Sequence, residues 1–231
     1  MKGIIGVVAA AVLLASGPAA AECEDKPKAQ VDWSECQKEH LILRGMEMQG
    51  AKLLQADLSA TDFMESDLRE ADLTGATLAR SRFRQAKLAG ARLDKVYAFR
   101  ANFLEADLSG ASLAKAELDR ALLARAVLAA ADLTKASLGR ADLRGADLSG
   151  AKLVQAYLAR TNLGGAALAG ADFTRAYFLL TRIEGTDLSA AVGLDQEQID
   201  ESCGDAGTKL PAGLMVPAAW PCPPLEEEEP D

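Results

Sequence analysis

The sequence predicts an all-β repeat protein, and three observations support this prediction. Residues 41–190 repeat every five residues without an insertion or deletion. Of the thirty positions reached from Leu43 in steps of five, twenty-two are Leu, five are Phe, one is Met and one is Ile, and only Ala98 is small. The residue two places before each of these is Ala at twenty-one of thirty positions, and ten of the twelve glycines in the range fall two places after them.

A period of five residues fits neither the 3.6-residue turn of an α-helix nor the two-residue alternation of a strand, so the repeat is a supersecondary unit. The small and the large residue are two apart, which places both on the same side of an extended segment. Glycine then supplies the positive φ that the third residue of a type II turn requires. Each unit is therefore interpreted as a short strand followed by a corner.

Units such as residues 106–110 and 146–150, both of sequence ADLSG, resemble the pentapeptide-repeat family, whose pattern is A(D/N)LXX. The resemblance implies a right-handed, four-sided parallel β-helix, a solenoid with twenty residues per coil and both apolar columns pointing inward. Thirty units then form about seven and a half coils. Phe63, Phe83 and Phe103 are twenty residues apart, and in such coils their rings stack.

The first residues have the features of a secretory signal peptide. An apolar run from Gly3 to Ala15 precedes Ala19 and Ala21, which satisfy the small-x-small rule for cleavage after Ala21. The run is short for a transmembrane helix, although an uncleaved anchor is the alternative. Glu22 disfavours lipidation of the cysteine that follows it. We therefore expect a periplasmic or secreted protein whose mature chain has no transmembrane segment.

The four cysteines are expected to form disulfides, because an even number in an exported protein is typical of a disulfide framework. Cys23 and Cys36 precede the repeats, and Cys203 and Cys222 follow them. Pairs across the repeats exceed the roughly 7 Å that linked Cα atoms span. The predicted pairs are Cys23 with Cys36 and Cys203 with Cys222, with free buried thiols as the alternative. No C-x-x-C spacing suggests zinc, and no other metal site is expected.

The predicted boundaries follow from the repeat and the cysteines. They are a signal peptide at 1–21, an N-terminal cap at 22–40, the β-helix at 41–190, a C-terminal cap at 191–225 and an acidic tail at 226–231. Residues 194–201 are expected to form a short helix that covers the last coil, because a β-helix otherwise exposes a backbone edge at each end.

The net charge of −9 lies at the ends of the chain rather than on the repeats. Residues 41–190 hold twenty basic and eighteen acidic side chains, whereas residues 191–231 hold one Lys and ten acidic residues. The best-known activity that the family resemblance implies is DNA mimicry, in which a strongly acidic rod occupies DNA gyrase. The nearly neutral repeats argue against this activity, and no nucleic-acid partner is expected.

The sequence contains no P-loop, G-x-S-x-G, H-E-x-x-H or dinucleotide-binding motif, so neither an enzyme nor a cofactor is expected. The single histidine, His40, precedes the repeats. Asp residues directly before the large residue belong to the repeat pattern and do not form a paired acid and base.

Counting in twenties aligns basic side chains on two adjacent faces of the expected β-helix. One ladder consists of Lys95, Lys115, Lys135 and Arg175, and the other of Arg80, Arg100, Arg120, Arg140 and Arg160. Like charges stacked about 5 Å apart repel each other, so these ladders are candidates for an anion-binding strip. Alternatively, the basic residues keep the outer surface soluble. Tyr157 and Tyr177 lie beside the strip, one coil apart.

The sequence therefore favours a non-catalytic, exported rod with a structural or protein-interaction role in the periplasm or envelope. An anion-binding module that uses the two basic ladders, with an envelope polymer, a lipid headgroup or another anionic component as partner, is the alternative. A DNA-mimicking gyrase inhibitor ranks third. The sequence leaves the partner, the oligomeric state and the biological process open.

Overall fold

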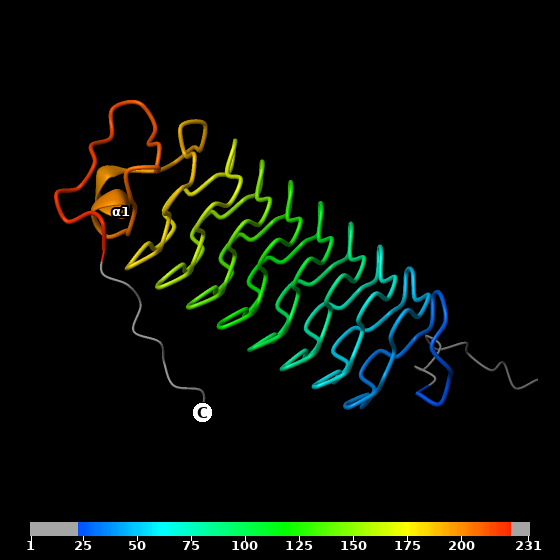
Figure 1. Ribbon diagram of the computed structural model, residues 1–231. Coiled ribbons are helices and arrows are strands. Elements are labelled where there is room, and N and C mark those ends of the chain that lie inside the picture. Colours follow the sequence, from blue (N-terminus) through cyan, green and yellow to red (C-terminus); the bar gives the residue numbers. More distant parts are fainter. Residues whose placement is uncertain (1–22, 223–231) are drawn as a thin grey trace, which may run out of the picture.

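The chain turns at every fifth residue and stacks each coil on the one before it, as the computed structural model in Figure 1 shows. The structure describes residues 23–222, so the predicted signal peptide and acidic tail lie outside the described residues. Within this range, extended backbone occurs as single β-bridges separated by two-residue turns. The one helix among these residues is α1 (Gln196–Asp200). Within residues 23–222, no helix is long and apolar enough to cross a membrane.

Parallel β-bridges join residues twenty positions apart and form four ladders along the coils. Asp107, for example, bridges Val127, which in turn bridges Asp147. The Leu108 amide donates to the Val127 carbonyl at 2.7 Å, and the Val127 amide donates to the Ala106 carbonyl at 2.9 Å. Each coil is thus bonded to the coils before and after it, and the expected twenty-residue coil is the repeat of the structure.

The two inward columns form one continuous core. The rings of Phe63, Phe83 and Phe103 stack with centroids 4.9 Å apart at both steps and interplanar angles of 7° and 6°, so the predicted stack is confirmed. The centroid distance also measures the spacing of the coils. Ala98 takes the place of a large residue and is fully buried beside the buried Val96. Burial of each large side chain contributes about 1.5 to 3 kcal/mol.

The corners place their second residue in the left-handed backbone region. The ten glycines that the repeat predicts there have φ between 62° and 70°. Twenty-two non-glycine residues also have positive φ, including Arg140 at 58°. The left-handed conformation costs about 1 to 2 kcal/mol for a residue with a Cβ. The Arg140 amide offsets part of this cost by donating to the Ala159 carbonyl at 2.9 Å. Glycine is therefore favoured at the corners but not required.

The recurrent Asp before the large residue has a structural role. Oδ1 of Asp57 accepts the Ser59 amide at 3.0 Å, and Oδ1 of Asp147 accepts the Ser149 amide at 3.0 Å. Each carboxylate closes the corner that follows it, as Asp does in many turns. Hydrogen bonding by Ser149 lowers the pKa of Asp147 below its ordinary value. The Asp column is thus a set of turn caps.

The coils begin before residue 41, although the repeat pattern predicted that they start at residue 41. Asp32 bridges Lys52, and both Val31 and Trp33 are buried in the inward columns. The Trp33 indole donates to the Asp25 carbonyl at 3.0 Å. The boundary differs because the inward residues here are not Ala and Leu, so they do not match the repeat although they fill the same places. The disulfide from Cys23 to Cys36, with Cα atoms 5.6 Å apart, closes this end.

At the C-terminal end, α1 takes the place of one side of a coil. Asp195 caps the helix by accepting the Gln198 amide at 2.9 Å, and Ile199 is fully buried against the core. After α1 the chain pairs again with the preceding coil, where Cys203 bridges Arg182. Residues inside the predicted 191–225 cap therefore still pair with the coils. Cys203 also forms the second predicted disulfide, with Cys222 at a Cα distance of 5.3 Å.

The side chain of Gln198 replaces a backbone donor where α1 interrupts the ladder. In a regular coil the Ala156 carbonyl accepts the Tyr177 amide at 2.9 Å. One coil later, Gln198 Nε2 donates to the Ala176 carbonyl at 2.8 Å and to the Phe173 carbonyl at 2.9 Å. The buried side-chain amide therefore satisfies the Ala176 carbonyl, which the last coil would otherwise leave unpaired, and adds a second donor to the Phe173 carbonyl, which also accepts the Ala176 amide at 2.9 Å.

Replacing Gln198 by Ala is expected to destabilise the C-terminal coils by about 1 to 3 kcal/mol, because the buried Ala176 carbonyl loses its donor. Hydrogen exchange should report faster exchange at residues 176–183, while residues 100–110 remain protected. Glu197→Gln, an exposed change in the same helix, is the matched control. Equal exchange in both variants would show that Gln198 is not needed at this end.

A buried carboxylate, Asp67, pairs with the exposed Arg69 near the N-terminal end of the β-helix. Asp67 is 3% exposed and receives two hydrogen bonds from Arg69, from Nε to Oδ1 at 2.9 Å and from the terminal guanidinium nitrogen to Oδ2 at 2.6 Å. These bonds outweigh the desolvation of the carboxylate and lower the pKa of Asp67 to about 2 from its ordinary 3.8. The charged form of Asp67 therefore stabilises the folded chain.

Asp67→Asn is expected to lower the free energy of unfolding by about 2 kcal/mol at pH 7, since a carboxylate with a depressed pKa favours folding when it is charged. The contribution is complete above pH 3.8 and is lost as the pH falls through about 2, so the two proteins converge in acid. Urea unfolding at several pH values measures this. Asp107→Asn, in the same column, is the control, and a pH-independent difference at Asp67 would contradict the prediction.

Candidate functional site

The two predicted basic ladders border one face of the β-helix. The ladder that begins at Lys95 and the arginine ladder occupy successive corners of each coil. The β-bridged residue between these two corners points outward. We call this surface the tyrosine face, and its outward residues are Thr77, Tyr97, Glu117, Ser137, Tyr157 and Tyr177. The arginine ladder follows one edge of this face, and the ladder that begins at Lys95 follows the other. The nine predicted residues therefore flank one surface.

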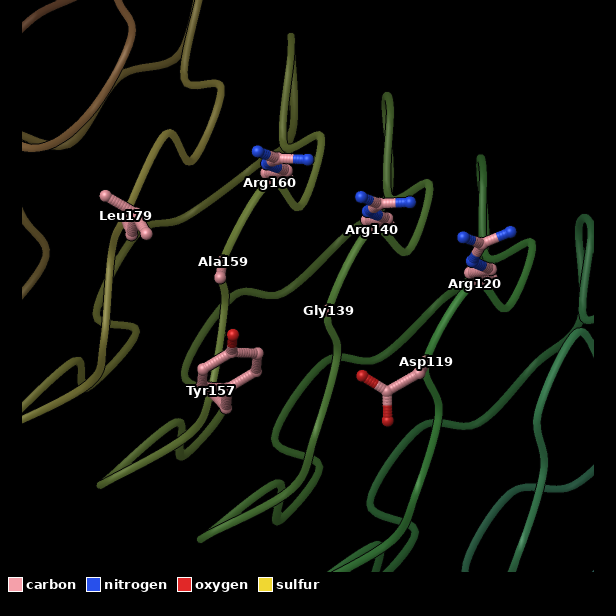
Figure 2. Close-up of a pocket in the computed structure, with 8 residues that line it drawn as sticks. All are labelled: Asp119, Arg120, Gly139, Arg140, Tyr157, Ala159, Arg160 and Leu179. Carbon is pink, nitrogen blue, oxygen red and sulfur yellow. The ribbon is translucent and has the colours of Figure 1, made fainter. Parts of the chain in front are cut away.

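The arginine ladder can contact a ligand through its side chains but not through its backbone amides. The amides of Arg120, Arg140 and Arg160 donate to the carbonyls of the next coil at 2.8 to 2.9 Å, so they are not available to a ligand. Their guanidinium groups stand at successive coils along one corner (Figure 2). In the described part of the chain, Arg160 forms no ion pair. Any anion held at this edge would therefore be bound by side-chain charge.

A hollow of about 410 Å³ opens where the arginine ladder meets the tyrosine face. It is lined by Asp119, Arg120, Gly139, Arg140, Tyr157, Ala159, Arg160 and Leu179. Figure 2 shows the three arginines along one side, the Tyr157 ring on the opposite side, and the Asp119 carboxylate directed towards the gap at Gly139. The hollow thus combines three cationic groups, one aromatic ring and one carboxylate.

Two small residues at successive coils create this hollow. Asp119, Gly139, Ala159 and Leu179 occupy the same turn position at twenty-residue intervals, so Gly139 and Ala159 form a floor between two longer side chains. A Cβ at Gly139 would lie 2.6 Å from Oδ1 of Asp119 and 3.2 Å from Cε1 of Tyr157. The same Asp119 oxygen accepts the Ser137 hydroxyl at 2.9 Å, which holds the carboxylate in place. Glycine therefore lets the Asp119 carboxylate and the Tyr157 ring approach the backbone closely at this position.

The tyrosines expected to lie one coil apart form a stacked pair. The rings of Tyr157 and Tyr177 have centroids 5.3 Å apart and an interplanar angle of 17°. Tyr157 is 45% exposed. Its neighbour on the other side in the ladder is Ser137, and the ring lies close to Gly139, where a Cβ would be 3.2 Å from Cε1 of Tyr157. Tyr157 thus packs on Tyr177 and lines the hollow beside Gly139.

The repeats match a known family directly. A family model described as pentapeptide repeats matches residues 42–78, 66–103, 78–113, 111–150, 121–158 and 151–189. The chain belongs to the pentapeptide-repeat family. Members of this family adopt a right-handed quadrilateral β-helix and are generally structural or interaction proteins.

Several solved structures are similar to this pentapeptide-repeat protein. HetL, a pentapeptide repeat protein involved in heterocyst differentiation regulation in the cyanobacterium Nostoc, is 30% identical, with 80% of this chain and 89% of HetL covered and a TM-score of 0.35. QnrB1, a plasmid-mediated fluoroquinolone resistance protein, is 17% identical, with 78% and 91% covered and a TM-score of 0.43. A pentapeptide repeat protein of the Arabidopsis thaliana thylakoid lumen is 32% identical, with 52% and 66% covered and a TM-score of 0.16. No curated protein matches the chain.

Within this family fold, the structure gathers only some of the predicted binding residues. Arg120, Arg140 and Arg160 line the hollow. Six others lie outside it, namely Arg80, Arg100, Lys95, Lys115, Lys135 and Arg175. Gly139, Ala159 and Leu179 were missed by sequence reasoning. One signal was present, because Gly139 is one of the two glycines in residues 41–190 that do not fall at the left-handed corner position.

The acidic side chains make local structural contacts. Hydrogen bonding from Lys209, with Nζ 2.8 Å from the carboxylate, lowers the pKa of the exposed Asp187 to about 2. Asp62 is fully buried. Burial raises the pKa of its carboxyl group, but hydrogen bonds from Arg44 and Arg82 lower the pKa by more, so the net shift is downward. Within residues 23–222, His, Cys, Asp and Glu do not gather in groups of three or more that would hold a metal.

Proposed function

We propose that this pentapeptide-repeat protein is a non-catalytic, exported rod that binds a protein partner in the periplasm or envelope through its tyrosine face. The exposed Tyr157 and Tyr177 pair carries this proposal, together with the neighbouring Leu179 and Leu180, which are 38% and 44% exposed. Tyr and Arg are enriched in protein interfaces because each provides a large contact area with a polar end. The stacked rings are fixed by the coils, so little conformational freedom is lost on binding.

Two disulfides support the exported location. They close the two ends of the described chain, and disulfides persist in oxidising compartments but are rare in the cytosol. The predicted signal peptide at residues 1–21 agrees with this location and lies outside the described residues. An exported protein does not meet the cytoplasmic gyrase, which places the DNA-mimic alternative last.

Expression of the full chain in a bacterium tests the location. We expect the protein in the periplasmic extract, with a mass that corresponds to cleavage after Ala21 and to two intact disulfides. Replacing the residues of the apolar run at 3–15 with polar residues is the control, and this variant should stay in the cytoplasm. Recovery of the uncleaved wild-type chain from the cytosol would overturn export and restore the gyrase alternative.

Anion binding along the arginine ladder is a second proposed function. The lack of an ion pair at Arg160 within residues 23–222 favours it, as does the gathering of three arginines at one hollow. Stacked cations about 5 Å apart repel each other, and an anionic partner relieves this repulsion. An envelope polymer, a lipid headgroup or another anionic component fits this surface.

Retention on heparin and on anionic vesicles, measured at increasing salt, tests the second function. Replacing Arg120, Arg140 and Arg160 together by Gln should weaken binding about tenfold, since each exposed charge pair contributes about 0.5 kcal/mol. The matched control replaces three exposed basic residues of other faces, Arg84, Lys87 and Lys152, by Gln. Equal losses in the two variants would show that only net charge matters, and retention that is insensitive to salt would exclude the ladder as a binding site.

A further inference from the structure

We propose that the acidic tail at residues 226–231 folds back onto the arginine ladder of the same molecule and competes there with an anionic partner. This inference rests on the second proposed function and adds a means of regulating it. The tail lies outside the described residues. Three features support the proposal, namely the place where the described chain ends, the charges near that place, and the order of the residues that follow.

The second disulfide fixes the start of the undescribed segment near the arginine ladder. Cys203 bridges Arg182, which in turn bridges Asn162, so Cys203 lies two coils beyond Asn162. Asn162 follows Arg160 by two residues. Coils are 4.9 Å apart and each residue spans at most about 3.6 Å, so the Cα atoms of Cys203 and Arg160 are about 12 Å apart. The Cα atom of Cys222 is 5.3 Å from that of Cys203, which places Cys222 within about 17 Å of Arg160.

The residues after Cys222 are long enough to reach the ladder. Residues 223 and 224 are both proline, which favours an extended chain. At about 3.3 Å per extended residue, residue 226 comes up to about 13 Å and residue 229 up to about 23 Å beyond Cys222. Residues 226–229 are four glutamates, and Arg140 lies one coil step of 4.9 Å beyond Arg160. The glutamates can therefore lie over Arg160 and Arg140.

Charge favours the arginine ladder as the docking site of the tail. Two other basic residues near this end already have partners, since Arg182 pairs with Glu184 and Lys209 pairs with Asp187. Arg160, in contrast, is exposed and forms no ion pair within residues 23–222. Guanidinium groups bind carboxylates through charge-assisted hydrogen bonds. Arg160 is thus an uncompensated cation within reach of four carboxylates.

The order of residues in the segment matches the order along the corner. Leu180 takes the place of an arginine one coil beyond Arg160 and is 44% exposed. Leu225 directly precedes the four glutamates. A segment that runs from Cys222 along this corner meets Leu180 first and the arginines next, so Leu225 can cover Leu180 while the glutamates reach the arginines. Removing Leu180 and Leu225 from water favours this register over contact at a corner without an exposed leucine.

Tethering makes the tail an effective but reversible competitor. A segment on a short linker acts at a local concentration in the millimolar range. Exposed charge pairs are individually weak and are screened by salt, so a partner that carries many anionic groups displaces the tail, whereas a small anion does not. The tail would thus restrict the ladder to polyvalent anionic partners.

A direct test of the contact replaces the four tail glutamates by Gln and records the NMR signals of the arginine side-chain Nε–H groups. We expect the Arg160 signal to shift, whereas the signal of Arg80, four coils away on the same corner, stays unchanged. The matched control carries the same change in charge far from this end, by replacing four exposed glutamates, Glu24, Glu35, Glu65 and Glu70, with Gln. An unchanged Arg160 signal would overturn the contact, and a shift that depends on protein concentration would assign it to a second copy instead.

Retention on heparin tests the competition. Replacing the tail glutamates should strengthen binding about tenfold, and the matched control should strengthen it by no more than about twofold. The gain should disappear when Arg120, Arg140 and Arg160 are also replaced by Gln, because the two changes act on one contact. Equal gains in the tail and control variants, or a gain that survives loss of the arginines, would overturn the competition. If no variant binds heparin or anionic vesicles, the second proposed function and the competition both fail, while the Arg160 signal still decides whether the tail contacts the ladder.

Discussion

The backbone hydrogen bonds between coils are the constraint on which the rest of the structure depends. Each bridged residue donates to the coil before it, and the large residue that follows donates to the coil after it, as the bonds of Val127 and Leu108 show. These bonds fix the repeat at twenty residues, because any other length would move the bridged residues out of alignment. Both ends of the chain can be understood as ways to stop this pattern. A disulfide closes each end, and at the C-terminal end the side chain of Gln198 provides the donor to the Ala176 carbonyl that a further coil would have supplied.

The same constraint leaves the outward positions free to vary, and this freedom generates the candidate site. Because the backbone donors and acceptors are used within the coils, a ligand meets side chains only. A single position in the repeat can then change the surface without disturbing the core. Gly139 and Ala159 remove side chains at two successive coils, and the three arginines beside them lose no backbone bond by turning outward. A rigid β-helix can thus carry a small binding site at a cost confined to the corner residues, which hold a left-handed conformation.

Most of the fold was predictable from the sequence because the period and the inward columns are local and repeated. The phenylalanine stack was predicted correctly from the spacing of the residues and the coil length that the family resemblance implies, and both disulfides from the predicted export and the positions of the cysteines on either side of the repeats. The start of the coils was placed too late, since Val31 and Trp33 fill inward places without matching the Ala and Leu of the repeat. The basic ladders were found by counting in twenties, but the hollow was not. The floor of the hollow exists because Gly139 has no side chain. One glycine is hard to recognise as significant at an outward turn position where many residue types occur.

The sequence by itself determined the period, the core and the pairing of the cysteines, because each follows from residue type and spacing along one chain. Only the tertiary structure decided which outward columns share a surface. It placed the two basic ladders on opposite edges of the tyrosine face and brought three arginines, Tyr157 and Asp119 around one hollow. The physical reason is that inward positions are selected by burial, which leaves a regular pattern, whereas a surface site depends on side chains from several coils whose arrangement exists only after the coils have stacked.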